Sequence, residues 1–360
     1  MDHPNSTPVL LEQIQSPAFI VENGKITEVN TAAAQKGITA KTEISSLIYT
    51  GKTEYEAYDK GKLCLTLQLS GVTCKATVTN LDFHHLFCLE SDYEEPELRA
   101  FSLAALQLRE PLTNAMINTD LLLPNPAVQN DPVILKQMSQ INRNLHQLLR
   151  AVCNMSDASL YGDGHFVNLQ QVDAVSVFAE TLEKATVLTK QSGRELKYKI
   201  PNQRVICPVD TPQLQRAILN LISNAVKYSN KNSTIHAELR HSSNRLIFSV
   251  WDDGNAVSAE KRKNLFSAYL REPGISADNS GIGLGMTIVH SIAAAHGGTL
   301  LIEQPENSGL KVTFTVCTKT DGTLQLRSPI MLPIDHSGGR DHALVELSDA
   351  LSDSLYDGKF

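Results

Sequence analysis

The sequence lacks most of the features that would place the chain outside the cytoplasm or on a charged polymer. Its 6 cysteines are scattered without a CxxC pair, so neither a disulfide framework nor a thiolate metal site is expected. Its 32 basic residues are outnumbered by 39 acidic ones, and the net charge of −7 argues against nucleic-acid binding. No apolar run approaches the roughly 18 residues that span a bilayer. The first residues, Met1-Asp2-His3-Pro4, do not resemble a signal peptide, and a cytoplasmic protein is expected.

What the sequence does contain is enough apolar material, 42%, for sizeable cores, and its 360 residues predict two or three domains. Residues 1–92 predict a small α/β domain, in which Asn23-Gly24 is typical of a two-residue hairpin turn and Ala32–Ala34 begin a helix. Strands are expected at 17–21, 26–30, 63–69, 73–78 and 86–89. The strand-turn-strand-Asn-helix opening resembles a PAS sensory domain.

Residues 93–158 predict two long helices joined by a short connection. Asp131-Pro132 supplies an N-cap and a first-turn proline for the second helix. Apolar or small residues alternate at steps of three and four, which is a heptad seam. The seams consist of Leu98, Phe101, Ala105, Leu108, Leu112, Ala115, Thr119 and Leu122, then Ile134, Met138, Ile141, Leu145, Leu148, Val152 and Met155. One antiparallel hairpin buries one face of each helix, so we expect a homodimer with a four-helix bundle rather than a hairpin packed on its own domains.

Residues 159–318 alternate between helical and strand patterns. We expect an antiparallel or mixed sheet with helices on one face. The helices are predicted at 174–190, 211–228 and 287–296, and the strands at 234–240, 245–251, 300–303 and 311–316. The tail, residues 319–360, contains an amphipathic run whose leucine stripe is expected to dock on the protein itself; the stripe is Leu344, Leu347, Leu351 and Leu355.

Three short motifs in this region suggest a nucleotide site without a P-loop. Asn220 and Asn224 are one helical turn apart in apolar sequence, and amide oxygens suit Mg²⁺. Lys227 can reach phosphate as a point charge, and Asp252, at the end of a strand, can accept a hydrogen bond from adenine. Three alternate glycines precede a helix whose N-terminus favours anions; they are Gly281, Gly283 and Gly285.

In this order and spacing the motifs resemble the N, G1 and G2 boxes of the ATPase superfamily shared by histidine kinases, type II topoisomerases, Hsp90 and MutL proteins. The resemblance implies a histidine-kinase-type α/β sandwich that binds ATP and Mg²⁺, with Asn224 as a metal ligand and Asn220 beside it. It also implies that Lys227 contacts phosphate, Tyr228 the base or sugar side, and Asp252 adenine. Residues 265–271 resemble the F box, in which Phe266 anchors a lid and Arg271 reaches phosphate. One departure concerns G1, because Gly254 is followed by Asn255-Ala256 where a second glycine is usual.

The histidine that a histidine kinase phosphorylates has no counterpart in the predicted hairpin. Residues 108–112, Leu-Arg-Glu-Pro-Leu, resemble the segment that follows this histidine, but Leu106 and Gln107 stand where the histidine and its acidic neighbour belong. Leucine has no nitrogen to attack phosphate, and glutamine is neutral. His146 lies on the second helix, where a solvated helix face is expected.

The sequence therefore predicts an α+β multidomain protein that is similar to sensor histidine kinases, which are ATP-dependent phosphotransferases. Autophosphorylation at the usual site is expected to be absent. The chain would be a pseudokinase or a kinase acting in trans, and the resemblance implies a response regulator or another kinase as its partner. A partner-directed serine kinase of the anti-sigma-factor type is disfavoured by the long seamed hairpin. A non-enzymatic dimeric scaffold is disfavoured by the retained Asn224, Lys227, Asp252 and glycines.

Overall fold

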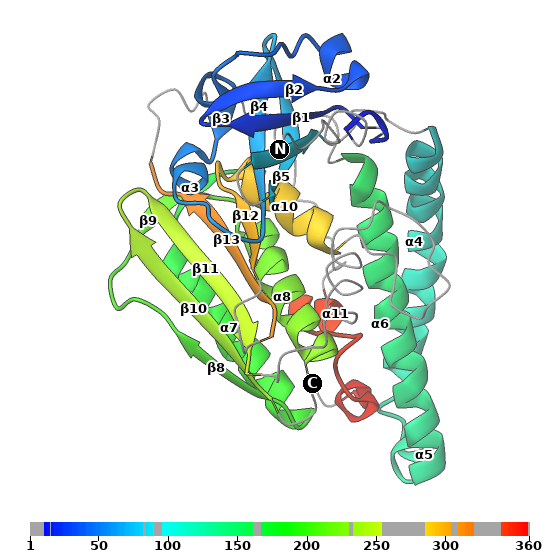
Figure 1. Ribbon diagram of the computed structural model, residues 1–360. Helices are drawn as coiled ribbons and strands as arrows, with labels where there is room; N and C mark the ends of the chain where they lie inside the picture. The colour runs from blue at the N-terminus through cyan, green and yellow to red at the C-terminus, as the bar shows by residue number, and fades with distance from the viewer. Residues whose placement is uncertain are drawn as a thin grey trace.

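A computed structural model describes residues 11–14, 16–81, 84–89, 96–160, 167–229, 233–253, 285–303, 309–319 and 340–358 of the chain (Figure 1). Its strands are β1 (Ala18–Glu22), β2 (Lys25–Val29), β3 (Ile48–Thr50), β4 (Lys62–Leu69), β5 (Val72–Leu81), β6 (His84–Leu89), β7 (Gln170–Asp173), β8 (Glu195–Lys199), β9 (Ile206–Val209), β10 (Thr234–Ser242), β11 (Arg245–Asp252), β12 (Leu300–Glu303) and β13 (Lys311–Cys317). Its helices are α2 (Thr31–Gln35), α3 (Lys52–Glu56), α4 (Pro96–Leu122), α5 (Pro126–Gln129), α6 (Pro132–Leu160), α7 (Ala174–Gln191), α8 (Thr211–Tyr228), α10 (Gly285–Ala295) and α11 (His342–Glu346), with 3₁₀ turns η1 (Ile44–Ser46) and η2 (Asp353–Tyr356).

The N-terminal strands form an antiparallel sheet in the order β2-β1-β6-β5-β4. Asn23 and Gly24 both have positive φ, 49° and 77°, as the expected two-residue turn between β1 and β2 requires. Asn30 caps α2 by accepting from the Ala33 N–H at 2.9 Å, and it also accepts from the Ala18 N–H at 3.0 Å. A single asparagine therefore fixes the helix start against the first strand.

This sheet continues into the next one through an antiparallel pairing of β4 with β12, in which Cys64 lies opposite Leu300. Among the described residues the result is one sheet of 11 strands, and β3 joins it by pairing with β4. The junction is close enough that a Cβ on Gly61 would meet the Ile302 carbonyl oxygen. Lys75 Nζ also donates to Ser291 Oγ at 2.7 Å. Regions that the sequence assigns to separate domains thus share backbone hydrogen bonds.

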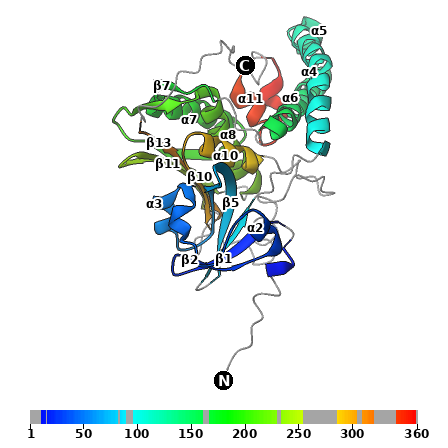
Figure 2. The same cartoon turned by 90° about the horizontal axis from the view of Figure 1, so that it is seen from above.

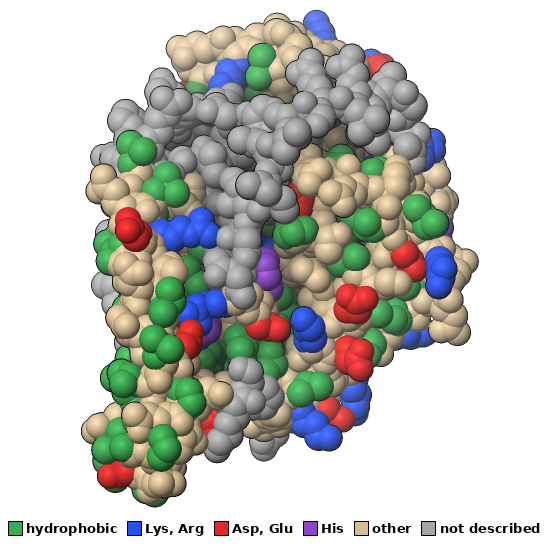
Figure 3. All heavy atoms as spheres, turned by 180° about the vertical axis from the view of Figure 1, so that it is seen from behind, with side chains coloured by type: hydrophobic (Ala, Val, Ile, Leu, Met, Phe, Trp, Pro, Cys, Tyr) green, Lys and Arg blue, Asp and Glu red, His purple; other side chains and the backbone are tan. Residues whose placement is uncertain are grey.

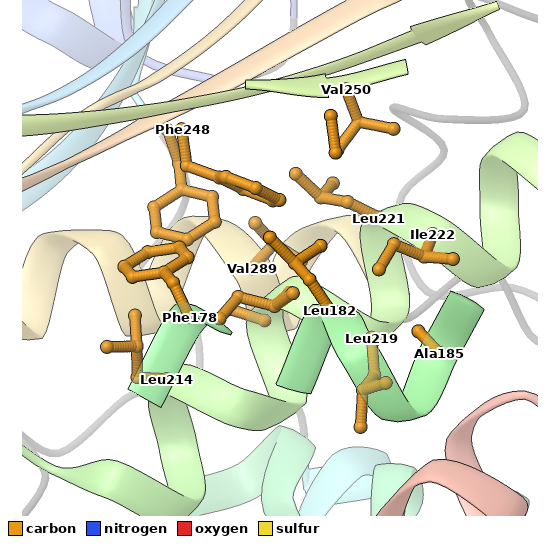
Figure 4. Packing of buried hydrophobic residues seen from close by; sticks show 14 of the residues in the cluster. Phe178, Leu182, Ala185, Leu214, Leu219, Leu221, Ile222, Phe248, Val250 and Val289 are labelled. Atoms are coloured by element: carbon orange, nitrogen blue, oxygen red, sulfur yellow. The ribbon is translucent and has the colours of Figure 1, made fainter. Parts of the chain in front are cut away.

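The second half of the sheet runs β12-β13-β11-β10-β8, and β8 pairs with β10 in parallel, so the sheet is mixed. Helices α7, α8 and α10 cover one face, and the apolar core lies between them and the strands (Figures 1 and 4). Phe178 of α7 packs on Phe248 of β11 and on Phe314 of β13, with ring centroids 5.0 and 6.2 Å apart. The helices and strands expected between residues 174 and 316 agree with these elements to within two residues at each end, but β8 and β9 were not expected.

Helices α4 and α6 pack side by side and are joined through α5 (Figure 1). The buried contact contains Ala105, Leu112 and Met116 of α4 with Leu149, Val152 and Cys153 of α6. This differs from the predicted seams, because Leu108, Leu122, Ile134, Ile141 and Leu148 are exposed. A straight helix has 3.6 residues per turn, so a strict heptad row drifts around its surface and cannot all face one neighbour. In the described part of the chain, no helix is long and apolar enough to cross a membrane.

The C-terminal segment, residues 340–358, docks between the hairpin and the sheet-covering helices. Asp341 caps α11 by accepting from the Ala343 N–H at 2.8 Å. Helix α11 lies between α6 and α8 in both ribbon views (Figures 1 and 2). Leu347, Leu351 and Leu355 are buried in the main core, so the leucine stripe docks on the protein as expected.

Candidate nucleotide site

Helix α8 carries the two asparagines of the candidate site. Its start is fixed by Asp210, whose side chain accepts from the Gln213 N–H at 3.2 Å, and by Pro212 in the first turn. Asn220 is fully buried, with 0% exposure, whereas Asn224 is partly exposed. A buried amide is stable only when it is hydrogen-bonded.

Gly285, the first residue of α10, lies against both asparagines. A Cβ at this position would sit 3.0 Å from Asn220 Oδ1 and 4.0 Å from Asn224 Nδ2. The structure therefore brings together three of the predicted site residues from two helices. The glycine leaves a space beside the amides that any larger residue would fill.

Lys227 and Tyr228 end α8, with the Lys227 Nζ 5.6 Å from the centre of the Tyr228 ring. Burial lowers the pKa of Lys227; Asp349 acts against this shift and Arg150 acts with it. Burial also raises the pKa of Tyr228, and the negative charge of Asp349 adds to this effect. Both side chains thus feel charges from α6 and from the C-terminal segment.

Asp252 is the last residue of β11, and its position depends on a glycine across the sheet edge. The Gly309 N–H donates to the Asp252 backbone oxygen at 3.2 Å. A Cβ on Gly309 would collide with the Asp252 carboxylate. The Asp252 carboxylate therefore occupies the volume that a side chain at position 309 would need.

Five of the predicted site residues lie outside the described residues: Gly254, Phe266, Arg271, Gly281 and Gly283.

A buried cluster of charges surrounds Asn220, and the sequence reasoning missed it. Arg150 of α6 donates from Nη2 to Asn220 Oδ1 at 3.1 Å and pairs through Nε with Glu346 Oε2 at 3.1 Å. Arg216 of α8 pairs with the other Glu346 oxygen at 3.2 Å, and Asn220 Nδ2 donates to Glu346 Oε2 at 2.9 Å. Arg150 Nη1 also pairs with Asp349 Oδ2 at 2.9 Å. We call these five residues the arginine cluster.

A signal for this cluster was present in the sequence. Arg150 follows Leu148-Leu149 and precedes Ala151-Val152, and Arg216 lies one turn before Asn220 on the same helix. Charged residues inside apolar runs are rarely buried unless they are paired, so both arginines implied distant carboxylates. The carboxylates themselves could not be identified, because Glu346 lies 196 residues from Arg150.

Leu106 and Gln107, which the sequence aligns with the acceptor histidine and its neighbour, lie on the outer surface of the hairpin. Leu106 is 52% exposed and Gln107 is also exposed, so no packing requirement determines either residue. His146 corrects the expectation of a solvated helix face, because it is buried. Its Nδ1 lies 2.8 Å from the Asn142 carbonyl oxygen and its ring packs on Tyr356 of the C-terminal segment. Burial lowers the pKa of His146.

Residues 209–320 match the family described as histidine kinase-, DNA gyrase B- and HSP90-like ATPases. Among curated proteins, the chain is similar to the adaptive-response sensory kinase SasA of Prochlorococcus marinus strain SARG, at 24% identity over 229 residues. That alignment covers 63% of this chain and 58% of the relative. The sensor protein KdpD of Escherichia coli K12 is 28% identical over 236 residues, or 64% of this chain and 26% of the relative. The chain thus spans 58% and 26% of the length of these two relatives.

Among solved structures, full-length ShkA in complex with AMPPNP matches 62% of this chain and 47% of its own, with a TM-score of 0.48 at 21% identity. Histidine kinase ThkA in complex with the response regulator protein TrrA matches 86% of this chain and 98% of its own, with a TM-score of 0.40 at 17% identity.

Proposed function

Because the chain belongs to the histidine kinase family, we propose that it is a sensor-kinase-like signalling protein that binds Mg-ATP but does not phosphorylate itself at the usual position. The observation that carries this proposal is the contrast between a retained nucleotide motif on α8 and Leu106 at the acceptor position on α4. We propose that a response regulator or another kinase is the partner. The chain would act on it either as a pseudokinase or by transferring phosphate in trans.

The described residues of the site fit a nucleotide with its metal ion. Gly285 has no side chain, so no Cβ crowds the amides of Asn220 and Asn224 from α10. Asn224 would supply an amide oxygen to Mg²⁺, which neutralises phosphate charge when it is bound. Lys227 would donate to phosphate, Tyr228 would line the base or sugar side, and the Asp252 carboxylate would accept from the adenine amine.

A homodimer through the hairpin is the second part of the proposal. Five residues of the predicted seams remain exposed, and three further apolar side chains of α4, Leu103, Ile117 and Leu121, are exposed as well. Figure 3 shows apolar side chains along this edge of the molecule down to α5. A single-chain surface rarely leaves so many large apolar residues exposed on one helical hairpin, whereas a second hairpin would cover them.

The remaining parts of the proposal concern organisation. We propose a PAS-like domain at 1–92, a dimerisation hairpin at 93–158, an ATP-binding domain at 159–318 and a tail at 319–360. The antiparallel order β2-β1-β6-β5-β4, with a capped helix after β2, supports a PAS-like arrangement. A cytoplasmic location is proposed from the scattered cysteines of the sequence.

Calorimetry with ATP, with and without Mg²⁺, tests the nucleotide part. Wild type should bind Mg-ATP, and Asn224→Ala should weaken binding only when Mg²⁺ is present. Asp252→Ala should weaken it in both conditions. Asn202→Ala, at an exposed loop position, is the matched control. Lack of binding by wild type at millimolar nucleotide would reject the site.

Incubation with labelled ATP tests the acceptor part. Wild type should gain no acid-labile phosphohistidine in residues 93–158, because Leu106 has no nucleophilic nitrogen and His146 is buried. The double substitution Leu106→His with Gln107→Glu should restore some label. Label mapped to His146 in the wild type would mean that the acceptor has moved, and the pseudokinase proposal would then be withdrawn.

A further inference from the structure

The arginine cluster places a carboxylate from the C-terminal segment directly on the candidate nucleotide site. Glu346 is 126 residues from Asn220 in the sequence, yet its carboxylate accepts from the Asn220 amide at 2.9 Å. A buried carboxylate is costly unless charged partners surround it. Here Arg150 and Arg216 each approach one of its oxygens, from α6 and α8 respectively. Arg150, Arg216 and Asn220 thus form an anion-binding site, and the Glu346 carboxylate of the same chain occupies it.

The charges of this site balance only while the C-terminal segment is docked. Two guanidinium groups face two carboxylates, those of Glu346 and Asp349. If the segment moved away, both arginines would lose their Glu346 contact in a largely buried place beside Asn220. Another anion would then be needed to compensate them.

The nucleotide that the proposed function brings to α8 is such an anion. Asn220 donates to Glu346 through Nδ2, and its Oδ1, which accepts from Arg150, lies next to Gly285 at the start of α10. Asp349, which pairs with Arg150, also acts on Lys227, the proposed phosphate contact. The carboxylates therefore neutralise the same cations that a polyphosphate would use.

We propose that the C-terminal segment, residues 340–358, is a tethered competitor of the nucleotide, in which Glu346 and Asp349 occupy an anion site formed by Arg150, Arg216 and Asn220. This inference rests on the proposed function, since it assigns a second ligand to the same site. Arg150 and Arg216 become polyphosphate-binding residues once the segment leaves.

The competition would also control how the hairpin is held. Arg143 of α6 donates to the Ser348 carbonyl oxygen at 3.1 Å and pairs with Asp353 at 2.9 Å. On the other side, the Ser352 N–H donates to Ser192 Oγ, just after α7, at 3.2 Å. The docked segment thus ties α6 to the helices of the ATP-binding region. Nucleotide binding would break this tie and release the hairpin.

The test compares three full-length proteins: wild type, Glu346→Gln with Asp349→Asn, and the control Asp353→Asn. The control removes a carboxylate from the same segment, but one that pairs with Arg143 and is absent from the arginine cluster. Calorimetry with Mg-ATP should show about tenfold tighter binding by the double variant, because a competitor that occupies most of the sites lowers apparent affinity by the fraction left open. The control should bind as wild type does.

Removing negative charge could by itself attract phosphate, so a second measurement is made on the wild type. Hydrogen exchange of residues 340–358 should speed up at saturating Mg-ATP, while exchange in β10 and β11 should not. Unchanged protection of 340–358 in nucleotide-bound wild type would overturn the inference, even if the double variant did not fold. Equal affinity in all three proteins would also overturn it and leave the nucleotide site intact. Absence of binding in all three would reject the nucleotide site itself, and with it this inference.

Discussion

Helices α4 and α8 depart from the usual distribution of side chains in opposite directions. Helix α4 presents large apolar residues to the outside, among them Leu106 and Leu108. Helix α8 turns polar groups inward, and Arg216 and Asn220 are almost completely buried. Exposed apolar patches and buried polar groups both require a partner. The partner of α8 comes from the C-terminal segment of the same chain, and we propose that the partner of α4 is a second copy of the chain.

The two helices also differ in how a substitution would affect their surroundings. Leu106 is on the surface, where its substitution would break few contacts within the chain. Position 220 is enclosed by hydrogen bonds to Arg150, Arg216 and Glu346, so its replacement would disturb all of them. A substitution at position 106 should therefore disturb the fold less than one at position 220.

The largest effect is expected from charging the outer face of the hairpin. Leu108→Asp with Leu148→Asp should convert a dimer into single chains. Each leucine buried at the interface contributes roughly 1.5–3 kcal/mol, and a dimer would lose four. Light scattering at tens of micromolar protein measures the mass. Val187→Asp, at an exposed position of α7, is the control, and a wild type with the mass of one chain would contradict the dimer.

The second-largest effect is expected from removing a buried positive charge from α8. Arg216→Met should lower the free energy of unfolding by about 3–5 kcal/mol, because Glu346 would lose one of its two guanidinium partners inside the protein. The matched control is Arg204→Met, whose guanidinium lies 3.8 Å from Asp173 at an exposed position; its effect should stay within about 0.5 kcal/mol. Urea unfolding measures both. If both variants lost a similar free energy of unfolding, the buried Arg216 of α8 would matter no more for stability than an exposed arginine.

A smaller effect is expected at Gly309. An alanine there would collide with the end of the Asp252 side chain and turn the carboxylate away, while the backbone could stay in place. ATP affinity should fall about tenfold, which corresponds to about 1.4 kcal/mol. GTP lacks the exocyclic amine at the same ring position. The substitution should therefore lower the affinity for GTP less than the affinity for ATP. An unchanged ATP affinity would show that Asp252 does not read the base.

The smallest effect concerns pH. Burial depresses the pKa of His146 and of His296 below the ordinary 6.5. The unfolded chain therefore takes up protons first, and stability should fall as pH drops below about 6.5 until the folded-state pKa is reached. His146→Asn should reduce the slope of unfolding free energy against pH in this window, as measured by urea titrations at several pH values. An unaltered slope would assign the effect to other groups.

Local signals accounted for much of the fold. Helix α8 begins and ends where the sequence predicts, because Asp210 and Pro212 mark its start and its apolar spacing is regular. The Asn23-Gly24 turn needed only two residues that tolerate positive φ. The pairing of β4 with β12 and the docking of Glu346 could not be predicted, since both depend on contacts between distant segments. The hairpin seams were predicted only in part, because the spacing alone does not decide which neighbour each row faces.

The join between β4 and β12 has a consequence for biosynthesis. The N-terminal strands leave the ribosome long before β12 does, so for most of translation residues 62–64 of β4 lack the strand that covers them in the finished protein. This stretch contains Leu63 and Cys64. Its unpaired backbone N–H and C=O groups can form hydrogen bonds with another extended chain. At Thr66 and Leu67 the same edge of β4 is covered by β3. A nascent chain thus exposes an unpaired strand edge at residues 62–64 until β12 has been synthesised and pairs with it.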